Sequence, residues 1–362
     1  MGDAAPAVLA IGAALLVVAL LSAAVTQLSI RYAHRRGMLD QPGVRRSHDV
    51  PTPRGGGIGI VVAAIAVCLF ERVINVDAQP WPLIAGILLV AIAGWVDDHR
   101  GLGVLPRLAL HAIAAAVVVW TLQASIVTGL ESPGLRAGAY GIALIACVWS
   151  INLHNFMDGI NGLLAAHAGF VLIVLAVLCA TTLRGGVHGA MLLLWAIATL
   201  AFLPFNFPRA RVFMGDVGSG VLGLLIAVGV LWQMQVAETA SVSGLIACSA
   251  FVIDATCNLL SRMLRGKRWY SAHREHLYQW MTRTGMSHAR VVGWYAGWNL
   301  FVVVPVLYWL NHDAPARLDH QTGTFLTRAD LVAVIGIYSV GIALWIFGKR
   351  WCLNRVKSHR HA

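Results

Sequence analysis

Long apolar segments follow one another along almost the whole chain, separated by short polar stretches. A helix needs ~20 mostly apolar residues to cross a hydrocarbon core of ~30 Å. Segments near this length occur at residues 7–30, 56–70, 81–96, 106–128, 139–153, 163–181, 187–204, 218–233, 242–261, 291–310 and 329–348. The pattern predicts an all-α, polytopic integral membrane protein with about 11 transmembrane helices, folded as a single transmembrane domain over residues 1–362.

The composition supports a lipid-bilayer environment, since 58% of the residues are hydrophobic and only 12% are charged. The first apolar segment is longer than the core of a typical signal peptide, and its positive charges follow it, so we expect it to be a retained anchor. The six cysteines show no CxxC spacing, and five fall inside apolar segments. They are expected to be small apolar residues, without disulfides or zinc.

The basic residues fall unequally on the two sides of the membrane. With the N-terminus outside, the inner loops and the C-terminal tail carry 22 of the 27 lysines and arginines, and the outer loops carry 5. Because basic residues accumulate in cytoplasmic loops, this predicts an N-out, C-in topology. The net charge of +11 is then explained by short loops at an anionic membrane surface, and no nucleic-acid partner is expected.

This topology places most of the chemically interesting residues on the cytoplasmic face, in loops 32–56, 97–107, 152–162, 204–218 and 262–290. Eight acidic residues in outer segments are expected to be solvated surface charges. By contrast, several inner acids stand within a few residues of an apolar segment, where a charge is costly unless it is paired or coordinated. We therefore expect the active site to be formed by the cytoplasmic loops.

One inner stretch, "NLHNFMDGINGLL" (152–164), carries polar side chains at a spacing of three: Asn152, Asn155, Asp158 and Asn161. In a helix this spacing keeps side chains on one half of the cylinder. The stretch therefore predicts a polar face that meets a ligand.

Two further inner motifs favour a metal and phosphate site. Asp97 and Asp98 are adjacent in "GWVDDHRGLG", and like charges repel unless a cation lies between them or they face different ways. Asp216 stands in "MGDVGSG" just before a new apolar helix, where glycines let the backbone approach a ligand closely. Carboxylates are suitable ligands for a Mg²⁺ ion that also binds a substrate phosphate. The cytoplasmic arginines could neutralise the charge of a diphosphate.

Five motifs in this order resemble the polyprenyl-phosphate N-acetylhexosamine-1-phosphate transferases, a family related to the phospho-MurNAc-pentapeptide translocases. The motifs are "PTPRGGG" (51–57), "DDHRGL" (97–102), "NLHNFMDGINGL" (152–163), "FNFPRARVFMGDVGS" (205–219) and "HREHL" (273–277). The resemblance covers about residues 45 to 290. It implies an enzyme of the bacterial cytoplasmic (inner) membrane, with its active site facing the cytoplasm.

The implied reaction moves an N-acetylhexosamine-1-phosphate from a UDP-sugar to undecaprenyl phosphate and releases UMP, starting O-antigen or a related surface glycan. The UDP-sugar stays open among the N-acetyl derivatives of glucosamine, fucosamine and quinovosamine, as does assembly into a homodimer. The resemblance implies Mg²⁺, or Mn²⁺, as the cofactor.

The resemblance also implies roles for individual residues. Asp97, Asp98 and Asp216 would be catalytic, and Asp216 would bind the metal with Asn155 beside it. The remaining substrate-binding set is Asn152, Asp158, Asn161, Arg54, Arg107, Arg211, His273, Arg274 and His276. Two departures from the family pattern, the H-R-E-H sequence at 273–276 and His99 directly after the acid pair, point to a variant sugar specificity.

Three other residues lie outside these motifs. Asp254 falls inside the ninth apolar segment, and a ligand-binding role and a structural role are equally compatible with the sequence. His111 and His167 are expected to be packing residues. The alternatives to an enzyme are a secondary transporter, which would place its polar groups near the midplane, and a non-catalytic scaffold, which would not need Asp97, Asp98 and Asp216 together.

Overall fold

The computed structural model describes residues 4–41, 50–122, 132–182, 185–236, 242–267, 274–312 and 327–361. Within these ranges almost every element is a helix, and the only ladder is the two-residue pairing of β1 (Leu39–Asp40) with β2 (Thr52–Pro53). The predicted all-α fold class is confirmed.

The apolar segments of the sequence coincide with helices. The first eight are α1 (Ala4–Arg36), α2 (Ile58–Ile74), α3 (Trp81–Arg100), α4 (Val104–Thr121), α6 (Pro133–Met157), α7 (Leu163–Ala180), α8 (Gly186–Asn206) and α9 (Asp216–Val236). They are followed by α10 (Ser243–Ala247), α11 (Ser249–Leu264), α12 (Leu277–Arg283), α13 (His288–Trp298), the π-helical turn η1 (Asn299–Val303), α14 (Val304–His312) and α16 (Arg328–His361).

In the described part of the chain, nine helical segments are long and apolar enough to cross a membrane. The multi-pass membrane fold is therefore confirmed, whereas the count of eleven spans stays a prediction. Two of the eleven predicted segments fall short of this length, because α2 has 17 residues and the ninth segment is divided at Cys248 into α10 and α11. Hydropathy does not reveal that division, since the residues on both sides of it are apolar.

The centre of the bundle is α9, which is buried along most of its length and packs against α3, α6 and α7. Its small residues permit this packing. A Cβ atom on Gly223 would come within 2.5 Å of the carbonyl oxygen of Ser150 on α6. The Ser150 hydroxyl in turn donates to the Gly223 carbonyl oxygen at 2.7 Å, which joins the two helices.

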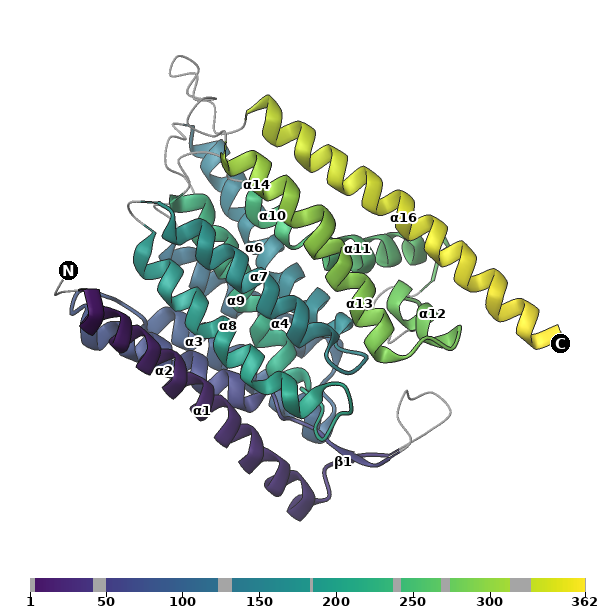
Figure 1. The fold of residues 1–362 in the computed structure, drawn as a ribbon, viewed down its shortest axis with the longest axis horizontal. Helices are drawn as coiled ribbons and strands as arrows, with labels where there is room; N and C mark the ends of the chain where they lie inside the picture. Colours follow the sequence, from purple (N-terminus) through teal and green to yellow (C-terminus); the bar gives the residue numbers. More distant parts are fainter. Residues whose placement is uncertain are drawn as a thin grey trace.

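The outer helices present apolar side chains to the surroundings. Figure 1 shows α1 and α16 along opposite edges of the bundle, with α9 between them. Ile142 on α6, Phe301 in η1 and Phe347 on α16 are 72%, 81% and 70% exposed. Apolar side chains this exposed are suited to contact with lipid chains, which agrees with a membrane-embedded bundle.

Several polar segments that are far apart in the sequence meet at one end of the bundle. The Phe213 amide donates to the Pro53 carbonyl oxygen at 2.8 Å, and the Gly56 and Gly57 amides donate to the carbonyl oxygens of Phe213 and Met214. This backbone pairing joins the segment after β2 to the segment that precedes α9. The C-terminal end of α3 lies beside the same point, since Asp98 contacts the first amides of α9.

Candidate active site

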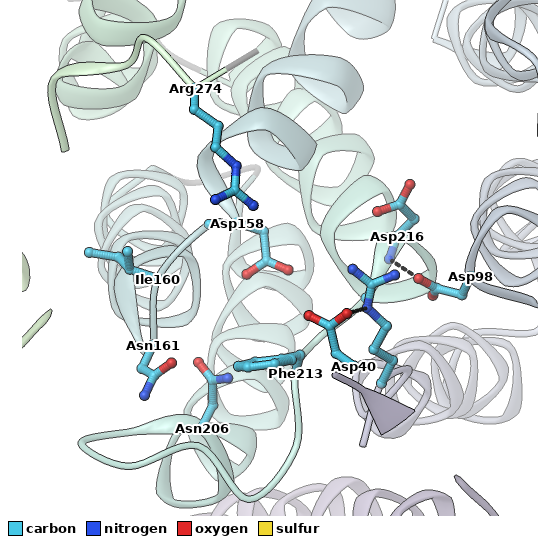
Figure 2. A pocket seen from close by; sticks show the side chains of 12 residues that line it. Asp40, Asp98, Asp158, Ile160, Asn161, Asn206, Phe213, Asp216 and Arg274 are labelled. Carbon is cyan, nitrogen blue, oxygen red and sulfur yellow. Dashed lines mark hydrogen bonds and ion pairs between the residues drawn. The ribbon is translucent and has the colours of Figure 1, made fainter. Parts of the chain in front are cut away.

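A polar pocket occupies this end of the bundle, and Figure 2 shows the side chains that line it. All five of the loops that the sequence predicted to form the active site contribute to it. The lining residues are Asp40, Arg54, Asp98, Asp158, Gly159, Ile160, Asn161, Asn206, Phe213, Gly215, Asp216 and Arg274. The pocket therefore brings four carboxylates and two guanidinium groups together at one site.

Asp98 fixes the start of α9. Its carboxylate oxygens accept hydrogen bonds from the amides of Asp216 at 3.2 Å and Val217 at 3.3 Å. The first amides of a helix have no partner within the helix, and the helix dipole favours a negative charge there. A carboxylate from α3 therefore caps α9 and aligns the two helices that carry the acidic residues.

Gly215 permits the close approach of these two helices. Its φ of +76° is one that other residues rarely adopt, and a Cβ atom at this position would lie 2.5 Å from Asp98 Oδ2. The glycine before Asp216 in the sequence motif is thus required both by the turn and by its neighbour.

Asp97, Arg107 and Asp216 form an ionic cluster beside the pocket. The Arg107 guanidinium lies 3.0 Å from Asp97 Oδ2 and 3.5 Å from Asp216 Oδ2. The carboxyl groups of Asp97 and Asp216 are also within hydrogen-bonding reach of each other. One arginine thus faces two carboxyl groups, with Asp98 close by, so acidic groups outnumber basic groups in this cluster.

The chemistry of these donors fits a hard divalent cation. Asn155 lies within hydrogen-bonding reach of Asp216, and its amide group donates to Ser219 Oγ at 3.0 Å. Among the described residues, no three histidine, cysteine or acidic side chains are arranged to hold a metal by themselves. Mg²⁺ is usually held by only one or two carboxylates, with waters and substrate phosphates as the other ligands, so this donor set fits it.

On the other side of the pocket, positive and negative side chains alternate. Arg54 Nε lies 3.5 Å from Asp40 Oδ1, and Arg274 points toward the pocket beside Asp158 (Figure 2). Burial and the negative charge of Asp98 raise the pKa of Asp158 to about 7, although the positive charge of Arg54 opposes this shift. Two arginines beside a carboxyl group that is largely neutral at pH 6 make this side favourable for an anion.

The segment between α6 and α7 is held by Asn206, a buried residue at the end of α8. Asn206 accepts from the Gly162 amide at 2.6 Å and donates to the Val212 carbonyl oxygen at 3.0 Å. Asn161 is tied to the following segment, since its amide group donates to the Pro208 carbonyl oxygen at 3.2 Å. Asp158 and Asn161 are therefore presented to the pocket by a cross-linked turn.

Three described residues of the predicted site make contacts outside the pocket. Asn152 donates to the Val148 carbonyl oxygen within α6 at 2.7 Å, and Arg211 stacks over the Phe205 ring at 4.7 Å. His276 is buried with its Nδ1 atom 3.9 Å from Asp254 Oδ1, and burial lowers its pKa, so at neutral pH it adds no charge to the pocket. His273 lies outside the described residues.

The structure also adds residues to the site. Asp40, Asn206 and Phe213 line the pocket but were given no role from the sequence. Asn206 and Phe213 stand inside the quoted motif 205–219, so the motif located them without indicating their function. Phe213 contributes an aromatic face to a pocket that is lined mainly by polar side chains, and such faces stack on nucleobases.

Comparison with known proteins identifies the family. Residues 80–234 match the family model described as glycosyl transferase family 4. The chain is 30% identical over 296 residues to a decaprenyl-phosphate N-acetylglucosaminephosphotransferase of Mycobacterium tuberculosis, covering 72% of each protein. The chain belongs to glycosyl transferase family 4. Within that family its relatives are the polyprenyl-phosphate N-acetylhexosamine-1-phosphate transferases, as the resemblance of the motifs indicated.

Two further relatives show a comparable similarity. A probable undecaprenyl-phosphate N-acetylglucosaminyl 1-phosphate transferase of Bacillus subtilis is 27% identical over 272 residues, which cover 73% of this chain and 75% of that protein. A phospho-N-acetylmuramoyl-pentapeptide-transferase of Bacillus velezensis is 27% identical over 317 residues, covering 82% and 85%. The chain is therefore an enzyme of the membrane that transfers a phosphosugar.

Proposed function

We propose that this enzyme transfers an N-acetylhexosamine-1-phosphate from a UDP-sugar to a polyprenyl phosphate such as undecaprenyl phosphate, with UMP as the second product. The observation that carries the proposal is the pocket, where carboxylates, two arginines and an aromatic ring meet at one end of a membrane-spanning bundle. A donor nucleotide reaches such a pocket from water, whereas a prenyl chain approaches it from lipid. The names of the relatives support both substrates.

The pocket residues suggest how the donor binds. Arg54 and Arg274 would neutralise the diphosphate, since guanidinium groups bind phosphate oxygens with two parallel hydrogen bonds. Phe213 would stack on the uracil ring, with Asn161 hydrogen-bonding the uridine. The half-buried Asp158 between these groups would contact the donor in its neutral form at slightly acidic pH.

We further propose that Asp216 and Asn155 hold Mg²⁺, or Mn²⁺ in its place, with the Asp97 carboxylate nearby. When bound, the ion would neutralise charge on the diphosphate and on the departing UMP. The donor set described above supports this assignment. Arg107 keeps Asp97 and Asp216 close together while their charges are otherwise uncompensated.

The chemical step is proposed to be a direct attack. An oxygen of the polyprenyl phosphate forms a new bond to the sugar-bearing phosphorus, while the bond from that phosphorus to the bridging oxygen breaks and UMP leaves. A phosphate monoester has a second pKa of about 6, so at neutral pH the acceptor is largely dianionic and needs little help from a base. Asp97 would orient the acceptor or take up a remaining proton, and Arg107 would stabilise the added charge.

A secondary transporter is not favoured. The intramembrane acid that made this alternative reasonable, Asp254, is 2% exposed and accepts hydrogen bonds from four protein donors. A carboxylate engaged in this way is poorly suited to exchange a transported ion. The four acids that line the pocket lie together at one end of the bundle and not at its midplane.

The deciding experiment is an assay of UMP release by detergent-purified enzyme. We expect release only when a UDP-sugar and polyprenyl phosphate are both present, and we expect excess EDTA to abolish it. A panel of UDP-N-acetylhexosamines, including the 6-deoxy sugars, would identify the donor. UMP release that persists in EDTA would refute the metal assignment, and no release with any donor would refute the proposed reaction.

The same preparation tests the direct attack. Enzyme freed of lipid should not exchange labelled UMP into the UDP-sugar, because the acceptor is absent. If exchange persists in delipidated enzyme and is lost in an Asp97→Asn variant, the phosphosugar is instead carried by that carboxylate.

We propose that the site faces the cytoplasm of a bacterial inner membrane, where UDP-sugars are made, and that the product starts a surface polysaccharide.

Single cysteines at Ser47 and Ser271 should be shielded from an impermeant thiol reagent in intact cells, whereas a cysteine at Ser132 should react. The basic charge distribution is the reason, since 22 of 27 lysines and arginines fall on the predicted inner side. Five of the six native cysteines are buried and Cys257 is half-buried, which keeps background labelling low. Labelling of the first two positions from outside would invert this topology.

A further inference from the structure

The buried carboxylate of Asp254 lies on α11 and contacts three other helices of the chain. It accepts hydrogen bonds from the Tyr295 hydroxyl on α13 at 2.7 Å and from the Trp345 indole N–H on α16 at 2.9 Å. It also accepts from the backbone amides of Leu277 at 2.8 Å and Tyr278 at 3.5 Å, the first two residues of α12. A single carboxylate thus joins α11, α12, α13 and α16.

Asp254 does not contact the substrate pocket, because it is absent from the residues that line it and is almost fully buried. Two of its hydrogen-bond donors are the first backbone amides of α12. An unpaired helical N-terminus is stabilised by a carboxylate, and here that carboxylate comes from another helix. Asp254 therefore fixes where α12 begins relative to α11.

The residues just before α12 lead into the pocket. Arg274 precedes Leu277 by three residues and lines the pocket beside Asp158 (Figure 2). The intervening Glu275 is held on α11's side by Arg262 and Lys267, each with a nitrogen 2.9 Å from Glu275 Oε1. Burial disfavours the Glu275 anion, but the hydrogen bond from Lys267 and the two positive charges outweigh it and lower the pKa of Glu275.

Arg274 thus stands on a short segment held from both sides. Glu275 is tied to the end of α11, and Leu277 and Tyr278 are tied to Asp254. The remainder of α12 has its own anchor, since the Tyr278 hydroxyl donates to the Phe156 carbonyl oxygen at 2.9 Å. Loss of the Asp254 contacts would release the start of α12 and the Arg274 segment, while that second anchor remains.

We infer that Asp254 is a positioning residue for the transfer reaction: it holds the start of α12 so that Arg274 is presented to the substrate diphosphate. The role of Arg274 rests on the proposed function, whereas the anchoring of α12 does not. An arginine that must meet a diphosphate with defined geometry loses much of its effect when its backbone shifts by about 1 Å, which can cost ~100-fold in rate.

The first test replaces Asp254 with Asn, which keeps the volume but turns an N–H group toward one of the donors that now face a carboxylate oxygen. We expect D254N to lower kcat/KM for the UDP-sugar by at least about tenfold, mainly through KM. In an Arg274→Ala background the same change should cost less than about threefold, because the group through which it acts is already gone. Equal losses in both backgrounds would overturn the inference.

A second measurement does not depend on activity. Hydrogen exchange of the peptide spanning 274–283 should be faster in D254N than in the parent, because Leu277 and Tyr278 donate to different oxygens of Asp254 and one of these two amides loses its acceptor. The control is Ser249→Ala on the same helix, which removes a buried hydroxyl that accepts from the Trp298 indole at 3.0 Å and does not contact α12. We expect S249A to leave both exchange of this peptide and kcat/KM unchanged. Parent-like exchange in D254N would overturn the anchoring, whatever the activity shows.

If D254N does not accumulate in cells, a substitution at Leu277, whose amide donates to Asp254, tests the same inference. Leu277 is the first residue of α12, a position where proline is tolerated, and His276 before it has the extended conformation that a following proline requires. Leu277→Pro removes the amide that Asp254 accepts from, and Leu277→Ala removes the side chain alone. We expect L277P to lose about tenfold more kcat/KM than L277A, and equal activities would contradict the proposal.

Discussion

Asp216→Asn will lower the rate of UMP release by at least about a hundredfold while the protein remains folded. Asp216 is the first residue of α9 and lines the pocket, 3.5 Å from the Arg107 guanidinium. The asparagine keeps the size of the side chain but removes its charge and one oxygen acceptor. The steady-state rate with saturating UDP-sugar and polyprenyl phosphate measures the effect.

Stability should change in the opposite direction. Asp216 lies close to Asp97 and to Asp98, so removing its charge relieves repulsion that Arg107 only partly offsets. The Tm of the detergent-purified variant should therefore equal or exceed that of the parent, which separates lost catalysis from lost folding. Glu71→Gln, on α2 near its C-terminal end, is the matched control and should retain activity. Parent-like turnover by D216N would refute the role of Asp216.

Gly94→Ala will lower activity by about a hundredfold and will also destabilise the protein. A Cβ atom on Gly94 would come within 2.4 Å of the carbonyl carbon and oxygen of Asp216. Because these are backbone atoms, no side-chain rotation relieves the collision, and α3 must move away from the start of α9. The movement separates Asp97 and Asp98 from Asp216, and overpacking of this kind costs about 1–3 kcal/mol.

The control for this change is another helical glycine. Gly141 on α6 has no atom within 4 Å of the position that a Cβ would occupy. Gly141→Ala should leave UMP release unchanged and keep or raise the Tm, since alanine favours a helix by about 0.5–1 kcal/mol over glycine. Thermal unfolding and the UMP assay on both variants test this prediction. Full activity in G94A would show that the transfer reaction does not require the close packing of α3 on α9.

Hydrophobic patterning located the helices because each one must cover its backbone groups and offer apolar side chains to lipid or to its neighbours. It was less informative where a helix breaks inside an apolar run. Nothing in residues 242–261 marks the division at Cys248, since both sides are equally apolar and the break depends on packing against other helices. The same holds for the π-helical turn between α13 and α14.

The sequence motifs identified the segments of the site better than the individual side chains. Asp98, Asp216 and Arg274 line the pocket, as does Asp158, but Asn152 bonds within its own helix and Arg211 stacks on Phe205. Spacing along a helix shows that side chains share a face, but it does not show what that face meets. Asp40 and Phe213 enter the pocket through the backbone pairing of residues 53–57 with 213–214, which is a tertiary contact.

The sequence by itself determined that this protein is a multi-pass helical membrane protein, and it located the five loops that contribute to the pocket, because composition and local order are sufficient for both. Only the tertiary structure decided the role of Asp254, which the sequence left equally divided between a ligand and a structural partner. Its four hydrogen-bond donors come from α12, α13 and α16, up to 91 residues away in the chain. A buried carboxylate is stable only where such donors converge, and their convergence is a property of the packed helices.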